Sequence, residues 1–131
     1  MKFFKLILFF SVFLTFTETE AQTVETFTNS GATLTNTATV NLTYKVKNTT
    51  TTAGFQVVNA KTSGTIAGKT YFQGSLDGTN YVNIDSLTNT DKATNSKLFL
   101  QNPVGYPYYR LSWTGSGTMV ATSSGYAFIK K

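Results

Sequence analysis

Residues 39–47 read TVNLTYKVK, and this stretch decides the fold. Its apolar side chains fall on every second position, and its polar side chains fall on the positions between them. The apolar set is Val40, Leu42, Tyr44 and Val46, and the polar set is Asn41, Thr43, Lys45 and Lys47. A period of two places successive side chains on opposite faces of an extended chain. The pattern therefore predicts a β-strand with one buried face and one solvated face.

Segments of similar kind lie on both sides of this stretch, and none of them has helical periodicity. Turn-rich clusters separate them about every ten residues, a spacing typical of β-sandwiches and barrels. The expected strands are 55–60, 69–75, 80–87, 97–101, 108–113, 118–122 and 126–130, and residues 61–68 are a loop or weak strand. Gly125 is expected to form a bulge or bend between the last two strands. We expect an all-β fold, a single antiparallel β-sandwich of about seven to nine strands, jelly-roll or immunoglobulin-like.

Strands 69–75 and 80–87 flank an Asp-Gly pair and are expected to form a hairpin. Because cross-strand partners share a face, placing Phe72 opposite Val82 requires an odd number of loop residues. This predicts a three-residue loop, Leu76-Asp77-Gly78, with Val82 and Ile84 pointing inward. Gly78 then occupies a left-handed position, and the Asp77 side chain caps the turn.

This hairpin carries a family resemblance. Residues 72–81, FQGSLDGTNY, resemble the S-x-D-G-x-x-[WY] hairpin of small extracellular β-sandwich modules, as in virion-surface proteins of tailed phages and discoidin-like carbohydrate-binding modules. The segments 108–111 (YYRL) and 115–118 (GSGT) resemble an aromatic-x-Arg strand and a glycine turn that follow in such proteins. The resemblance spans residues 64–131. It implies a sandwich fold and a role in structure or binding.

The amino-terminal residues 1–21 have the three-part layout of a secretory signal peptide. Lys2 and Lys5 precede the apolar run LILFFSVFLTF at 6–16, and Thr19-Glu20-Ala21 offers a cleavage site. The run is shorter than the roughly 20 residues of a spanning helix, so no stable membrane span is expected after cleavage. The Ala21-Gln22 ending resembles processing sites of exported proteins of Bacteroidota. We expect a signal peptide at 1–21, a β-sandwich domain at 22–131, and a secreted, periplasmic or cell-surface protein.

The composition excludes several kinds of catalysis. The chain has no His and no Cys, which removes Ser-His-Asp triads, thiol nucleophiles, the usual zinc ligands and disulfides. The acids after residue 21 are Glu25, Asp77, Asp85 and Asp91, and their positions suggest no catalytic pair and no calcium loop. The formal net charge is +5, but the bases are scattered, so no nucleic-acid partner is expected. We expect no enzymatic activity, no cofactor and no metal.

The aromatic residues indicate a contact surface. Tyr109, Leu111 and Trp113 alternate and are expected in the core, which turns Tyr108 and Arg110 to the opposite face. Tyr71 and Tyr81 are expected on the outward face of the hairpin, and the four outward residues form the candidate contact surface. The expected function is a non-enzymatic exported surface or virion-like structural or interaction module, acting by self-association as a homo-oligomer or by docking on a protein. The alternative is a small carbohydrate-binding module with a glycan partner.

Overall fold

The computed structural model describes residues 22–131, and the signal peptide expected at 1–21 lies outside the described residues. The described part is all-β, with two antiparallel sheets, so the predicted fold class is confirmed. From Gln22 onward the structure contains no helix that could cross a membrane.

Between residues 22 and 131, nine strands make up the two sheets. They are β1 (Thr23–Thr26), β2 (Ala32–Thr35), β3 (Thr39–Lys45), β4 (Thr52–Ser63), β5 (Lys69–Ser75), β6 (Val82–Thr88), β7 (Thr94–Gln101), β8 (Tyr108–Thr114) and β9 (Val120–Lys130).

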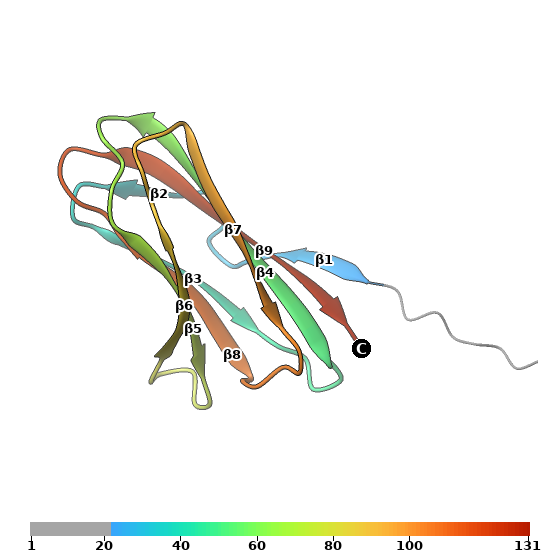
Figure 1. The fold of residues 1–131 in the computed structure, drawn as a ribbon. Helices are drawn as coiled ribbons and strands as arrows, with labels where there is room; N and C mark the ends of the chain where they lie inside the picture. The colour runs from blue at the N-terminus through green and yellow to red at the C-terminus, as the bar shows by residue number, and fades with distance from the viewer. Residues whose placement is uncertain (1–21) are drawn as a thin grey trace, which may run out of the picture.

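The strand order identifies a jelly roll (Figure 1). Sheet A has the order β1-β9-β4-β7, with β2 also paired to β9, and sheet B has the order β3-β8-β5-β6. Leaving β1 aside, each sheet has four strands that alternate early and late segments of the chain, which is the jelly-roll arrangement of two Greek keys. The strand order thus decides between the jelly-roll and immunoglobulin-like alternatives.

The core lies between the sheets and is rich in aromatic rings. The four apolar side chains of the TVNLTYKVK stretch are all buried, as their period predicted. Phe72 of sheet B stacks on Phe99 of sheet A with 4.8 Å between ring centroids and on Tyr109 at 5.3 Å. Tyr109, Leu111 and Trp113 are buried, as expected. The two layers therefore share one continuous core.

Two strands of sheet A are longer than expected. β4 spans twelve residues rather than six, because it pairs with β9 on one side and β7 on the other. β9 runs unbroken through Gly125, where a break was expected. A Cβ at Gly125 would lie 2.8 Å from the ring of Phe27, so the glycine makes room for a core side chain within a continuous strand.

The register of the β5–β6 hairpin differs from the prediction. Phe72 lies opposite Asp85, not Val82, and a bulge shifts the pairing between Phe72 and Gln73. Val82 lies opposite Gly74, on the side of β5 that Phe72 shares, so its direction agrees with the prediction, but Val82 is 54% exposed and Ile84 is 36% exposed. Both are exposed because β6 is the edge strand of sheet B. The connection from β5 to β6 covers residues 76–81, twice the expected loop length.

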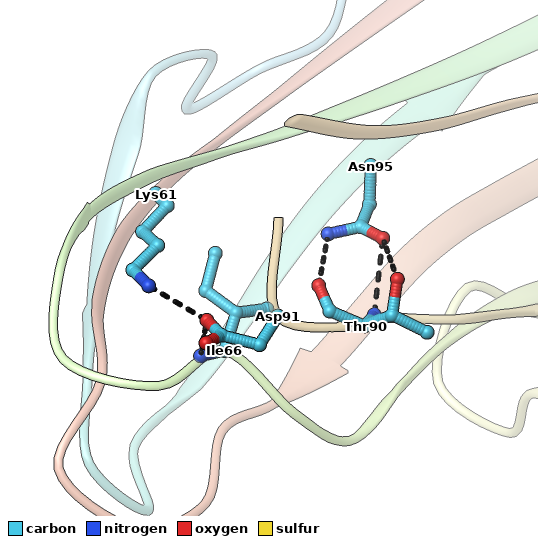
Figure 2. A network of polar contacts seen from close by, with 5 residues as sticks. All are labelled: Lys61, Ile66, Thr90, Asp91 and Asn95. Carbon is cyan, nitrogen blue, oxygen red and sulfur yellow. Dashed lines mark hydrogen bonds and ion pairs between the residues drawn. The ribbon is translucent and has the colours of Figure 1, made fainter. Parts of the chain in front are cut away.

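Polar contacts fasten the loops at one end of the sandwich (Figure 2). Asp91, between β6 and β7, accepts hydrogen bonds from Lys61 Nζ at 2.7 Å and from the backbone N–H of Ile66 at 3.1 Å. Asn95 holds Thr90 through both its amide oxygen and its amide nitrogen. These contacts tie the β6–β7 loop to the β4–β5 loop, so Asp91 has a structural role.

Candidate binding face

The outer face of sheet B carries the four residues predicted as a contact surface. Strand register aligns Thr43 of β3, Arg110 of β8, Gln73 of β5 and Asn83 of β6 in one row across the sheet. Ser112 and Tyr71 belong to the next outward row, and Tyr108 lies on the other side of Arg110 along β8. We call this surface the tyrosine face, defined by Tyr71, Tyr81, Tyr108, Arg110, Gln73, Asn83, Thr43 and Lys45.

Arg110 is the centre of the tyrosine face and is held in one orientation. Its guanidinium carbon lies 4.0 Å from the centroid of the Tyr81 ring, within the range of a cation–π contact. Its Nε donates a 2.8 Å hydrogen bond to Gln73 Oε1, and Gln73 Nε2 donates a 2.7 Å bond to Asn83 Oδ1. Within residues 22–131 the terminal nitrogens of Arg110 have no hydrogen-bond partner. The guanidinium is therefore positioned in advance with donors that a ligand can use.

A shallow hollow of about 320 Å³ lies between β3 and the β5–β6 loop, and the Tyr81 ring that lines it also contacts Arg110. Its lining includes Thr43, Lys45, Tyr81 and Tyr108, together with Gly78 from the hairpin loop. The Lys45 ammonium lies 5.5 Å from the centroid of the Tyr108 ring. The volume is at the lower end of the roughly 300–1,000 Å³ typical of small-ligand sites. The hollow combines aromatic surface with amine and hydroxyl groups.

Tyr71 extends the tyrosine face beyond the hollow. It is 38% exposed, whereas its neighbour Phe72 is fully buried, as the alternation of β5 requires. Tyr71 pairs with Ser112, two residues along β8 from Arg110. Diagonal neighbours of this kind lie about 7–8 Å apart, so the Tyr71 ring and the Arg110 guanidinium can contact one ligand.

The Asp-Gly turn sets the position of Tyr81. Asp77 Oδ1 accepts hydrogen bonds from the backbone N–H groups of Thr79 and Asn80, both at 2.8 Å, and Oδ2 accepts from Asn80 Nδ2 at 2.7 Å. These bonds, led by the Asn80 N–H, hold the pKa of Asp77 far below its usual range. Gly78 has φ of 76°, in the left-handed region that favours glycine. The turn therefore delivers Tyr81 onto Arg110 at the start of β6.

The acids of the described residues are engaged in structural contacts. The pKa of each carboxyl group is lowered, for Glu25 chiefly by Lys47, for Asp85 by Lys97, for Asp91 by Lys61 and for Asp77 by the Asn80 backbone. From residue 22 to 131, no three His, Cys, Asp or Glu side chains gather as a metal site would require. The face offers hydrogen-bond donors, acceptors and rings, but no carboxyl group poised to donate a proton at neutral pH.

Sequence reasoning did not assign four members of the tyrosine face, Thr43, Lys45, Gln73 and Asn83, to the contact surface. Thr43 and Lys45 lie on the polar side of the stretch 39–47, and Gln73 lies two residues after Tyr71 in β5, so the alternation could have found all three. Asn83 lies between Val82 and Ile84, so the expected alternation already turned it outward, and the bulge changes the parity only of Asp85 and the residues after it. The role of the face as a binding site stays a prediction.

No protein-family model and no curated protein sequence matches the chain. Among solved structures, the chain is similar to one titled "Family 16 Carbohydrate Binding Module-2", at 16% identity and a TM-score of 0.43, over 70% of this chain and 70% of that chain. It is also similar to the structure of infectious bursal disease virus Gx strain, at 16% identity and a TM-score of 0.27, over 85% of this chain and 29% of that chain. With TM-scores this low, the assignment to the jelly roll rests on the chain's own strand order.

Proposed function

We propose that the chain is a non-enzymatic, exported binding module that binds a glycan on the tyrosine face. The observation that carries the proposal is the geometry of Arg110. One side of its guanidinium is covered by Tyr81 and its Nε is held by Gln73, while its terminal nitrogens remain available on a face that also carries the exposed Tyr71 ring.

The chemistry of the face matches a sugar ring. A pyranose has C–H groups on its faces, which pack on flat aromatic rings, and hydroxyl groups at its edge. Tyrosine supplies the ring with little loss of side-chain freedom, and the planar fork of arginine donates to two oxygens at once. Asn83 and Thr43 add amide and hydroxyl groups that can donate or accept. A neutral glycan needs this mixture, whereas a nucleic acid would require clustered bases.

The acids favour binding over hydrolysis. A glycoside hydrolase needs one carboxyl group that keeps its proton near neutral pH, which requires a raised pKa. All four acids after residue 21 have a lowered pKa instead, because each one is hydrogen-bonded as a carboxylate.

Export supports the same function. The signal peptide expected at 1–21 would carry the protein to a compartment where glycans are displayed. The absence of cysteine leaves nothing in the chain that depends on the redox state of that compartment. A secreted, periplasmic or cell-surface location follows from this proposal.

The tyrosine face does not favour self-association. Two copies meeting through it would bring Arg110 and Lys45 toward the same side chains of the second copy. Like charges placed together at an interface weaken association. A glycan of low charge meets no such repulsion.

A glycan array followed by calorimetric titration of the best ligand tests the proposal. We expect Tyr71→Ala and Arg110→Ala to weaken binding at least about tenfold each, which corresponds to about 1.4 kcal/mol. Tyr126→Ala is the matched control, because Tyr126 is 37% exposed but lies on the outer face of sheet A. An array without a reproducible ligand, or equal losses for Tyr71→Ala and Tyr126→Ala, would contradict the assignment.

A further inference from the structure

The outer face of sheet A carries exposed apolar side chains from strands far apart in the sequence. Strand register aligns Val24, Phe128, Gly54 and Leu100 in one row, and Thr26, Tyr126, Gln56 and Leu98 in the next outward row. Val24 is 72% exposed, Leu100 62% and Leu98 51%. We call these two rows the apolar patch.

The surface of the apolar patch is uneven, with a ring packed over a glycine and a small hollow beside it. Gly54 leaves room for the ring of Phe128, since a Cβ there would lie 1.8 Å from the Phe128 Cε1. Beside this ring lies a hollow of about 100 Å³, lined by Val24, Gln56, Leu98 and Tyr126 among others. The hollow has room for part of one apolar side chain from outside, while Leu98 and Leu100 project at the edge formed by β7.

The apolar patch carries no charge. Neither of its two rows contains an acid or a base, and the following outward rows hold Ser124, Val58 and Ser96, then Thr122, Ala60 and Thr94. Lys130 lies at the margin, opposite Thr52. The charged side chains that give the chain its net charge of +5 therefore lie outside the two rows of the patch. A second copy can approach this face without repulsion, whereas a partner selected by opposite charge gains nothing here.

The size of the face suits a dimer. Sheet A is four strands wide, and β9 is eleven residues long. With about 4.8 Å between strands and about 3.3 Å per residue, the outer face covers on the order of 700 Å². A stable interface buries about 800 Å² on each partner. The two rows of the apolar patch take up roughly 13 Å of the strand length, or on the order of 250 Å², and the uncharged outward rows beside them supply the rest of the face.

We propose that the apolar patch is the interface of a symmetric homodimer, in which the sheet A faces of two copies pack against each other. In a twofold interface each copy contributes the same patch, so Leu98 and Leu100 of one copy can pack beside Tyr126 and Phe128 of the other. Packing through sheet A leaves the two tyrosine faces on opposite sides of the dimer. The dimer would therefore present two binding faces to separate ligands.

Light scattering and sedimentation of the purified protein, expressed from the full-length sequence, test the dimer from 5 to 500 µM. We expect a dimer whose dissociation constant rises at least about a hundredfold in the Leu98→Lys, Leu100→Lys double variant. Leu76→Lys is the matched control, because Leu76 is 73% exposed in the β5–β6 loop, away from the patch. A monomer throughout this range overturns the proposal and leaves the patch to a different protein or a lipid surface. A dimer unaffected by the double variant overturns it as well.

Spin labels test the orientation without disturbing the patch leucines. Since the chain has no cysteine, Thr122→Cys, on the outer face of sheet A but outside the apolar patch, and Tyr71→Cys each give one labelling site per copy. With sheets about 10 Å apart, labels at residue 122 should be the closer pair, and labels at 71 should be separated by roughly 30 Å or more. The reverse order would mean that the tyrosine faces meet, and it would overturn the proposal. This result is independent of glycan binding, so the two proposals can fail separately.

Discussion

Tyr71 and Tyr126 are almost equally exposed, yet they lie on outer faces of opposite character. Around Tyr71 the face of sheet B holds Arg110, Gln73 and Asn83, which are linked by hydrogen bonds. Around Tyr126 the face of sheet A holds Leu98, Leu100 and Val24, and no charge. Exposure alone therefore does not distinguish a polar ligand site from an apolar interface. The neighbours supplied by adjacent strands distinguish them.

The largest expected effect is a loss of folding stability, and it tests which side chains of β5 face the core and which face outward. Phe72→Ala removes a buried ring that stacks on Phe99 and Tyr109, and should destabilise the fold by about 3–5 kcal/mol. Tyr71→Ala, one residue away on the outer face, should cost less than about 0.5 kcal/mol. Denaturant unfolding of both variants gives the comparison. Equal losses would mean that the inward and outward assignments in β5 are wrong.

A smaller loss of stability is expected at the turn that positions the tyrosine face, and only there should it be accompanied by weaker glycan binding. Gly78→Val forces a branched residue into a left-handed conformation and should cost about 1–2 kcal/mol, because φ at Gly78 is 76°. Gly117→Val is the control, since Gly117 has φ of 71° and lies between β8 and β9. We expect similar losses of stability, measured by thermal unfolding. Only Gly78→Val should also weaken glycan binding, because Gly78 lines the hollow beside Tyr108. Loss of binding in both variants would contradict a local role for the turn.

The smallest expected effect is a pH dependence of folding stability that arises from Asp77 in the β5–β6 turn. The pKa of Asp77 is lowered from its ordinary value of 3.8, so its contribution to stability is present above about pH 4 and is lost as the pH falls through the folded-state pKa. Asp77→Asn should therefore lower the melting temperature at pH 7, and its difference from the unmodified protein should shrink toward pH 2. Calorimetric melts at pH 7, 4 and 2 measure the difference. A difference that stays constant with pH would show that the charge of Asp77 does not hold the turn.

Local sequence pattern determined much of the fold. The alternation in residues 39–47 predicted β3 and its buried face, and β5 begins and ends where expected. The alternation of Tyr109, Leu111 and Trp113 predicted which face of β8 lies in the core. These features depend on neighbours one or two positions away, and the period of a strand carries that information directly.

Side-chain contacts over longer distances decided the features that the sequence did not reveal. The register of β6 depends on the bonds made by Asp77 and on a bulge, and neither follows from alternation. Asn59 is fully buried because Thr70, Asn89 and Ser123, from other segments, satisfy its amide. Burial of such a group is favourable only when these partners are in place.

The two outer faces show which features the sequence determines by itself and which depend on the tertiary structure. The sequence by itself determined that Tyr71, Tyr108 and Arg110 point away from the core, because each lies next to a buried residue in its strand. Only the tertiary structure decided what surrounds them. Val24, Leu98 and Phe128 have no local pattern in common, and they form one patch because the jelly roll places β1, β9, β4 and β7 side by side. A strand's own sequence sets which side chains face outward, whereas the order of strands in the sheet sets which of them become neighbours.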